Sequence, residues 1–134
     1  MKILVTSGGT SEAIDSVRSI TNHSTGRLGK IITETLLAAG HEVCLITTKR
    51  AVKPEAHPNL SIREITNTKD LLLEMQERIK DYQVFIHSMA VSDYTPVYMT
   101  GLEEVQASSN LEEFLNKQNH QAKISSTDEV QVLF

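Results

Sequence analysis

The chain has 134 residues, of which 40% are hydrophobic and 22% charged, and its formal net charge is −4. This length suits about one domain, and the composition is that of an ordinary globular protein. Aromatic residues make up only 4% and tryptophan is absent, which together with the negative charge disfavours a protein that stacks nucleic-acid bases or binds polyanions broadly.

The first third of the chain predicts a buried strand, a long connection and a helix. Lys2–Thr6 is short, apolar and β-branched and is followed by Ser-Gly-Gly, which is typical of a buried strand with a turn at its end. Residues 7–25 form the connection, in which residues 12–20 can hold a short helical turn. From Gly26 onward the apolar residues recur at helical spacing, and Gly40 stands where a C-terminal cap belongs.

The middle of the chain predicts three more strands and a second helix. Glu42–Thr47 is apolar and reads as a buried strand, whereas Leu60–Ile65 alternates and reads as a more exposed one. Thr68–Lys80 carries apolar residues on one face and predicts an amphipathic helix with Thr68 as its N-cap. Val84–Ser88 predicts a fourth strand.

This order of elements predicts an α/β fold with a Rossmann-like, doubly wound and mainly parallel sheet. We expect residues 1–134 to form a single domain. Residues 94–122 are polar and predict a flexible, flap-like segment with a short helix at 111–117. Residues 130–134 begin another strand pattern, which suits either a terminal strand or a chain whose C-terminal part is absent.

Cys44 is the only cysteine, so no intrachain disulfide can form, as in proteins of a reducing compartment. No signal peptide is visible, and no apolar run approaches the length of a membrane span. The histidines show no metal-ligand spacing. We therefore expect a cytoplasmic protein with no membrane partner, no nucleic-acid partner and no protein metal site.

The most informative stretch is residues 6–30, which directly follows the first strand. It holds four of the six glycines: Gly8, Gly9, Gly26 and Gly29. Glycine lets a backbone approach a ligand closely, and hydroxyls with free N–H groups at a helix N-terminus bind phosphate. The stretch matches neither the GxGxxG dinucleotide fingerprint nor the P-loop. For residues 7–10, a tight strand-to-helix turn is the purely structural alternative. Ser24 or Thr25 is the expected N-cap of the following helix, and this cap is compatible with phosphate binding there.

A second polar cluster, residues 87–93, follows the fourth strand. Ligands of parallel sheets bind beyond the carboxyl ends of the strands, and right-handed crossovers bring this cluster near residues 7–10. Asn22 can both donate and accept hydrogen bonds, so it can hold a carbonyl or acyl-phosphate oxygen. Asp93 alone in a loop is more often a cap or a solvated residue, but its place after a strand favours a role in ligand binding.

The run GGT-x4-D-x2-R-x3-NHSTG-x2-G from Gly8 to Gly29, followed by MAVSDY at residues 89–94, resembles phosphopantothenate–cysteine ligase. This family is the synthetase of coenzyme A biosynthesis, which in bacteria is often fused to a flavin-dependent decarboxylase. Lys123-Ile124 with Ser125-Ser126 is similar to the lysine-bearing flap of that family. The resemblance covers the whole chain, and the family's domain is longer. It implies that residues 1–134 form a single domain that binds a nucleotide and phosphopantothenate.

The resemblance implies an amide-forming ligase. CTP (ATP in eukaryotic members) would activate the carboxylate of 4′-phosphopantothenate, with Mg²⁺ neutralising the triphosphate, and the amine of L-cysteine would attack the acyl-nucleotide. It also implies a homodimer, and we expect no FMN because the chain carries no sequence for the decarboxylase half. Asn22 and Lys123 are the candidate catalytic residues. The candidate residues for binding nucleotide and substrates are Gly8, Gly9, Thr10, Ser24, Gly26, Gly29, Ser88, Met89, Ala90 and Asp93.

Two other functions stay open. A Rossmann-type NADP-binding reductase is suggested by the GGT turn and by Lys49-Arg50, which can read a 2′-phosphate. The missing glycine triplet and the absence of a Tyr-x-x-x-Lys pair count against it. A nucleotide-binding module without turnover is the third possibility.

Overall fold

The structure is a computed structural model that describes residues 1–118, 124 and 130–134, and contacts divide the chain into two compact units. The larger unit comprises Met1–Ser11 and Thr21–Ser92, and the smaller unit comprises Glu12–Ile20 and Asp93–Phe134. The candidate catalytic residue Lys123 lies outside the described residues. That residues 1–134 act as one ligand-binding domain stays a prediction.

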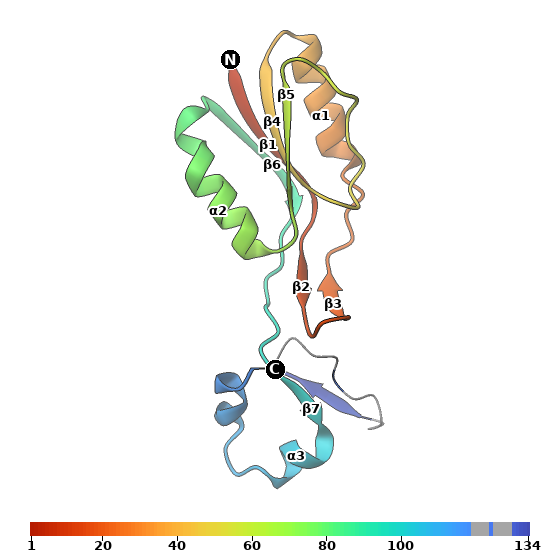
Figure 1. Ribbon diagram of the computed structural model, residues 1–134, viewed down its shortest axis with the longest axis vertical. Helices are drawn as coiled ribbons and strands as arrows, with labels where there is room; N and C mark the ends of the chain where they lie inside the picture. The colour runs from red at the N-terminus through yellow and green to blue at the C-terminus, as the bar shows by residue number, and fades with distance from the viewer. Residues whose placement is uncertain (119–123, 125–129) are drawn as a thin grey trace. The chain divides into compact units, whose positions relative to one another are not determined.

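A parallel sheet forms the core of the larger unit (Figure 1). Within the described residues its strands lie in the order β5-β4-β1-β6, with bounds β1 (Lys2–Gly9), β4 (Glu42–Thr48), β5 (Leu60–Ile65) and β6 (Val84–Ala90). The two central strands, β1 and β4, are buried along nearly their whole length. Sheets covered on both faces require such continuous apolar strands, and the predicted α/β fold with a mainly parallel sheet is confirmed.

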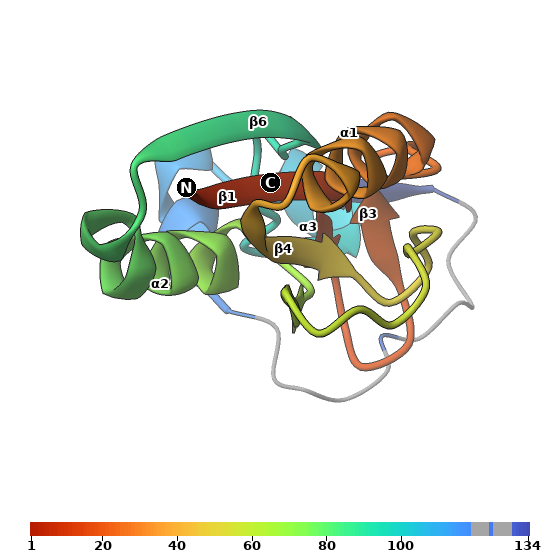
Figure 2. The same cartoon turned by 90° about the horizontal axis from the view of Figure 1, so that it is seen from above.

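Two helices cover opposite faces of this sheet (Figure 2). Helix α1 (Arg27–Ala38) contributes Leu37 to a core cluster with Ile3 of β1, and helix α2 (Thr68–Arg78) contributes Leu71 to a second cluster with Leu4 of β1. Because successive side chains of a strand point to opposite faces, the neighbours Ile3 and Leu4 anchor the two helices on the two sides.

The ends of the helices follow local rules. Gly40 has a φ of +83°, and its N–H donates to the carbonyl oxygen of Leu37 at 3.0 Å, so the predicted C-terminal cap of α1 is confirmed. The prediction of Thr68 as the cap of α2 is wrong, because Asn67 caps this helix. The Asn67 side chain accepts the N–H of Asp70 at 2.8 Å, and the Asp70 carboxylate accepts the N–H of Asn67 at 3.4 Å. A short 3-10 helix, η1 (Ile79–Asp81), follows α2.

Residues 12–20 do not form the predicted helical turn. Strands β2 (Ser11–Ala13) and β3 (Ser19–Thr21) pair with each other instead. In the turn between them, the Asp15 carboxylate accepts the N–H groups of Val17 at 2.9 Å and Arg18 at 2.7 Å. An aspartate that bonds the backbone two and three residues ahead stabilises a turn in competition with a helix.

The smaller unit has regular structure where the sequence predicts a loop. Strand β7 (Met99–Gly101) pairs antiparallel with β8 (Gln131–Leu133), and α3 (Leu102–Ala107) follows β7 directly. The short helix predicted at 111–117 is present as the 3-10 helix η2 (Leu111–Asn116). A flap-like motion of residues 94–122 stays a prediction.

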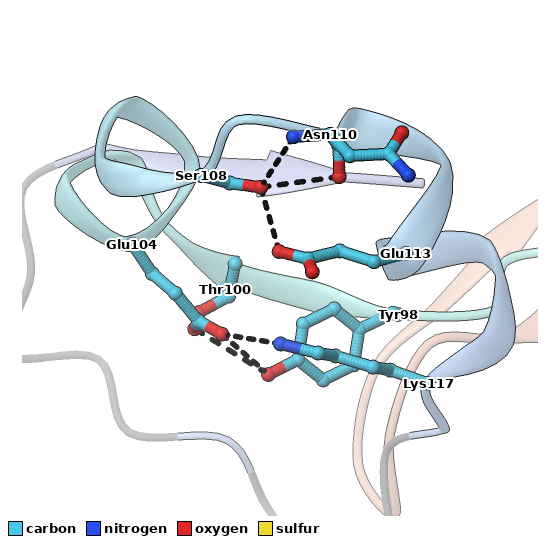
Figure 3. Close-up of polar contacts among 7 residues, drawn as sticks. All are labelled: Tyr98, Thr100, Glu104, Ser108, Asn110, Glu113 and Lys117. Atoms are coloured by element: carbon cyan, nitrogen blue, oxygen red, sulfur yellow. Dashed lines mark hydrogen bonds and ion pairs between the residues drawn. The ribbon is translucent and has the colours of Figure 1, made fainter.

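The core of the smaller unit is aromatic. Phe114 is fully buried and stacks on the rings of Tyr98 and Phe134, with centroid distances of 6.0 and 4.8 Å. The Lys117 ammonium lies 4.7 Å from the Phe114 ring centroid. It also lies 2.9 Å from a carboxylate oxygen of Glu104, as Figure 3 shows. The charge pair ties the residue after η2 to α3, and the two ring stacks tie η2 to Tyr98 and Phe134.

The Glu104 carboxylate is the hub of this polar network (Figure 3). Hydrogen bonds from the Thr100 hydroxyl and the Lys117 ammonium hold the pKa of Glu104 below its usual value. The same contact with Glu104 raises the pKa of Lys117.

Among the described residues, no helix combines the length and the hydropathy needed to cross a bilayer.

Candidate functional site

Three segments of the larger unit meet at the carboxyl ends of β1 and β6: residues 7–10, 22–29 and 88–92. The β1–β6 register places Ser7, Gly8 and Gly9 beside Ser88, Met89 and Ala90. The N–H of Thr10 donates to the carbonyl oxygen of Ala90 at 3.0 Å, and the Thr10 and Ser92 hydroxyls are 2.8 Å apart. The prediction that the crossovers bring the two polar clusters together is confirmed.

Asn22 lies at the junction of these segments. Its side-chain Nδ2 donates to the carbonyl oxygen of Ala90 at 3.3 Å, and its backbone N–H donates to the carbonyl oxygen of Thr10 at 3.0 Å. A carboxamide has two N–H bonds and an acceptor oxygen. Among the described residues, only this bond is made by the half-buried Asn22 side chain, so one N–H and Oδ1 stay available for a ligand, while the bond to Ala90 fixes the direction of the side chain.

Gly26 and Gly29 allow helix α1 to begin against strand β1. Gly26 caps α1 with a φ of +76°, and a Cβ atom there would lie 2.8 Å from the Cβ of Ala51. A Cβ on Gly29 would lie 2.4 Å from both Cβ and Oγ of Ser7. Protein packing therefore requires both glycines, whatever the ligand. Neither Ser24 nor Thr25 is the N-cap, although the Thr25 hydroxyl accepts the N–H of Arg27 at 3.3 Å.

The N-terminus of α1 has the properties of an anion site. Its first intrahelical bond runs from the N–H of Lys30 to the carbonyl oxygen of Gly26 at 3.0 Å. The N–H groups of Leu28 and Gly29 precede this bond and have no acceptor within the helix. The helix dipole adds partial positive charge. Arg27 makes no ion pair within the described part of the chain, whereas Lys30 pairs with Glu34 at 3.7 Å.

Sequence reasoning missed the loop after β4 that supports both glycine turns. Ala51 is buried beneath Gly26, and the N–H of Val52 donates to the carbonyl oxygen of Thr25 at 2.9 Å. The Lys53 ammonium donates to three loop carbonyls and pairs with Glu64 at 3.4 Å, which holds this loop in shape. The only sequence signal for this loop was a short apolar pair, Ala51-Val52, between the basic residues Arg50 and Lys53.

The remaining predicted site residues are placed as follows. Ser24 is half-buried in the segment that leads to α1. Asp93 is exposed and belongs to the smaller unit, directly after Ser92. The exposed pair Lys49 and Arg50 follows β4.

No group of three His, Cys, Asp or Glu side chains among the described residues can hold a metal ion.

A depression at the opposite end of the sheet is a separate feature. Its volume is about 650 Å³, and its lining residues are Lys2, Glu77, Arg78, Asp81, Tyr82 and Gln83. It lies where β1 and β6 begin, whereas parallel sheets bind ligands where the strands end. Its lining mixes both charges and offers no glycine turn, so the convergence at the carboxyl ends is the better candidate.

Comparison with known proteins gives one consistent family. A family model described as the DNA/pantothenate metabolism flavoprotein C-terminal domain matches residues 1–128. The coenzyme A biosynthesis bifunctional protein CoaBC of Thermococcus kodakarensis is 36% identical over 93 residues, which are 69% of this chain and 23% of that protein. The corresponding protein of Vibrio vulnificus is 32% identical over 94 residues, again covering 23% of its length.

Solved structures agree with these matches. The crystal structure of the DNA/pantothenate metabolism flavoprotein from Streptococcus pneumoniae is 92% identical, with a TM-score of 0.94 over 100% of this chain and 58% of that chain. The C-terminal domain of a CoaBC protein is 34% identical, with a TM-score of 0.66 over 72% of this chain and 48% of that chain. These matches confirm the resemblance carried by the two motifs. The chain spans 23% of the length of the two curated relatives.

Proposed function

The chain belongs to the DNA/pantothenate metabolism flavoprotein C-terminal domain family, and on this premise we propose that it forms the amide bond between 4′-phosphopantothenate and L-cysteine. The curated relatives are named as coenzyme A biosynthesis proteins, which supports this reaction. A carboxylate is a poor electrophile, so a nucleoside triphosphate first converts it to an acyl-nucleotide with release of pyrophosphate. The cysteine amine then attacks the acyl carbon, loses a proton and releases the nucleoside monophosphate.

The observation that carries this proposal is the convergence of the glycine turns, Asn22 and the end of β6. An anion site at the start of α1 lies in the same unit as an amide side chain that is fixed by the carbonyl of Ala90. Acyl transfer through a phosphoanhydride needs both features: donors for the phosphates, and a fixed donor for the oxygen on which charge develops. The free N–H of Asn22 fits the second role.

The roles of the single residues follow from this placement. We assign the N–H groups of Leu28 and Gly29, with Ser24, to the triphosphate. Asn22 holds the activated acyl oxygen, and the backbone of residues 88–90 lines the substrate side. Lys123 is the proposed cation that neutralises the reacting phosphate. Asp93 is proposed as a substrate contact on the resemblance alone.

Nucleotide, metal and assembly are parts of the same proposal. CTP is the proposed nucleotide because the bacterial ligases that the chain resembles use it. Mg²⁺ enters with the triphosphate, and phosphate oxygens and water suit it as ligands, with at most one or two carboxylates. We propose a homodimer in the cytoplasm and no FMN, on the same resemblance.

Two measurements test the function. Thermal unfolding is followed with CTP, ATP or NADPH, and a ligand at about 100 times its Kd stabilises the chain by about 2.7 kcal/mol. Pyrophosphate release is then assayed with and without 4′-phosphopantothenate, and the amide product with and without L-cysteine. We expect CTP to stabilise the chain and pyrophosphate release to require the acid substrate.

The outcomes separate the alternatives. Stabilisation by NADPH alone refutes the ligase and favours the reductase suggested by Lys49 and Arg50. Nucleotide binding without pyrophosphate release favours a module without turnover. Asn22→Ala should slow amide formation if Asn22 holds the acyl oxygen. Asn59→Ala, at an exposed asparagine before β5, is the matched control and should leave turnover unchanged.

A further inference from the structure

One threonine at the end of β1 binds two other segments of the larger unit. The N–H of Thr10 donates to the carbonyl oxygen of Ala90, and the carbonyl oxygen of Thr10 accepts the N–H of Asn22, both at 3.0 Å. The side-chain oxygen of Thr10 accepts the N–H of Ser92 at 2.8 Å and lies 2.8 Å from the Ser92 hydroxyl oxygen. The contact between the Thr10 hydroxyl and Ser92 is called here the Thr10–Ser92 latch.

The latch is buried and extends the pairing of the two strands. Thr10 has 0% exposed area, and Ser92 is half-buried. Strand β6 ends at Ala90, so the backbone ladder with β1 does not reach Ser92. A buried N–H group without an acceptor costs the free energy of its desolvation. The Thr10 side chain therefore keeps this segment attached to β1 after the regular pairing has ended.

The latch bears on Asn22 through the carbonyl group of Ala90, which accepts the Asn22 side-chain N–H at 3.3 Å. Only Val91 lies between this carbonyl and the N–H of Ser92. Because peptide units are planar, a fixed Ser92 leaves the Ala90 carbonyl only the two backbone torsions of Val91. The backbone of Asn22 is held separately by the Thr10 carbonyl. The direction of the Asn22 amide thus depends on the oxygen that the latch holds in place.

We propose that Thr10 and Ser92 are positioning residues that aim the Asn22 amide at the reacting acyl oxygen, a role that rests on the proposed function. The sequence suggested Thr10 as a ligand-binding residue, but its fully buried hydroxyl is directed to Ser92. Misplacing a reacting group by about 1 Å can cost about a hundredfold in rate. Loss of the latch should therefore lower kcat about tenfold to a hundredfold.

The KM values should stay within about twofold of wild type, because the ladder between β1 and β6 still holds residues 88–90. Thr10→Val is the informative change, since valine has nearly the shape of threonine without its hydroxyl. Thr10→Ser keeps the hydroxyl and should recover most of the rate. Thr33→Val is the matched control: Thr33 is also 0% exposed, and its hydroxyl has no hydrogen-bond partner among the described residues.

The latch itself is tested without any substrate. Amide hydrogen exchange of Ser92 and the side-chain amide signals of Asn22 are measured by ¹⁵N NMR in wild type, Thr10→Val and Thr33→Val. We expect Ser92 to exchange at least about tenfold faster in Thr10→Val and the Asn22 signals to shift, with no change in Thr33→Val. Equal Ser92 exchange in Thr10→Val and wild type overturns the latch.

The positioning role is tested by a double-mutant cycle. The kcat for amide formation is measured for Thr10→Val, Asn22→Ala and the double variant, and Thr33→Val should keep the wild-type rate. If the Thr10 hydroxyl acts only through Asn22, the double variant is no slower than Asn22→Ala. A double variant slowed by the product of the two single effects overturns the proposal, as does an unchanged kcat in Thr10→Val.

Folding and function are separated by two further controls. The unfolding midpoint of each variant is measured, and Ser92→Ala, which keeps the backbone N–H, replaces Thr10→Val in the cycle if the valine variant does not fold. A wild-type chain that forms no amide refutes the proposed function and the positioning role together. An active wild type with independent effects at Thr10 and Asn22 refutes the positioning role alone. The Ser92 exchange result still decides whether the latch exists.

Discussion

Replacing Gly29 by alanine should push helix α1 away from strand β1. A Cβ atom at position 29 would lie 2.4 Å from both Cβ and Oγ of Ser7 and 3.0 Å from Oγ of Ser88. Ser7 is fully buried in β1, so its Cβ atom cannot move without moving the strand. Carbon atoms pack at about 3.5–4.0 Å, so the first turn of α1 must retreat by roughly 1 Å.

The expected cost combines two opposing terms. Overpacking a buried contact typically costs about 1–3 kcal/mol. Alanine in place of glycine near a helix start recovers up to about 1 kcal/mol through propensity. The hydroxyl of Ser7, which donates to the carbonyl oxygen of Gly26 at 3.0 Å, is strained by the same shift. We therefore expect a net loss of about 1–2 kcal/mol in the free energy of unfolding.

A double-mutant cycle of Gly29→Ala and Ser7→Gly, measured by urea denaturation, tests this contact directly. Ser7→Gly removes both atoms that the added Cβ would overlap, so the double variant should regain most of the loss caused by Gly29→Ala, with a coupling of about 1–2 kcal/mol. Gly29→Ala should also reduce the thermal shift with CTP, because the N–H groups at the start of α1 move. A Gly29→Ala variant as stable as wild type and uncoupled from Ser7 refutes the packing argument.

Three other changes probe separate features. Asn22→Ala removes one donor from the Ala90 carbonyl and should lower the free energy of unfolding in urea by about 0.5–1.5 kcal/mol. Amide formation should slow at least about tenfold. Normal turnover would contradict the role of Asn22 in holding the acyl oxygen. Phe114→Ala should destabilise the smaller unit by about 3–5 kcal/mol, seen in tyrosine fluorescence during denaturation. The pKa of Asp15 is lowered in the folded chain. The stabilisation from the ionised Asp15 carboxylate is therefore complete above the usual aspartate pKa and is lost as the pH falls through the lowered pKa. Exchange protection of the Ile124 N–H, which Asp15 accepts, should accordingly fade only in acid.

Much of the larger unit could be predicted from local sequence patterns. Lys2–Thr6 and Glu42–Thr47 are continuous apolar runs because the central strands of a parallel sheet are buried on both faces. Gly40 could be placed because a left-handed cap needs glycine. These features depend on a residue and its near neighbours, so the sequence carries them directly.

The smaller unit was harder to predict because its elements are short and depend on side-chain bonds and on pairing with distant residues. Strand β7 and helix α3 are too short to show a hydrophobic period, and β7 pairs with β8, which lies 30 residues further along the chain. In the β2–β3 turn, the Asp15 side chain competes with the helix that residues 12–20 suggested. Local helix propensity is overridden where such side-chain hydrogen bonds set the backbone conformation.

The chemistry of the candidate site divides in the same way. The parallel α/β order, the glycine-rich stretch suited to phosphate, and the pair of motifs that indicates the family can all be recognised in the sequence. The three-dimensional contacts were needed to show that Asn22 binds the Ala90 carbonyl, that Gly29 is required by Ser7, and that the β2–β3 turn holds Ile124. Periodicity records which residues are buried, whereas contacts between distant residues depend on strand register and crossovers, which a linear pattern does not contain.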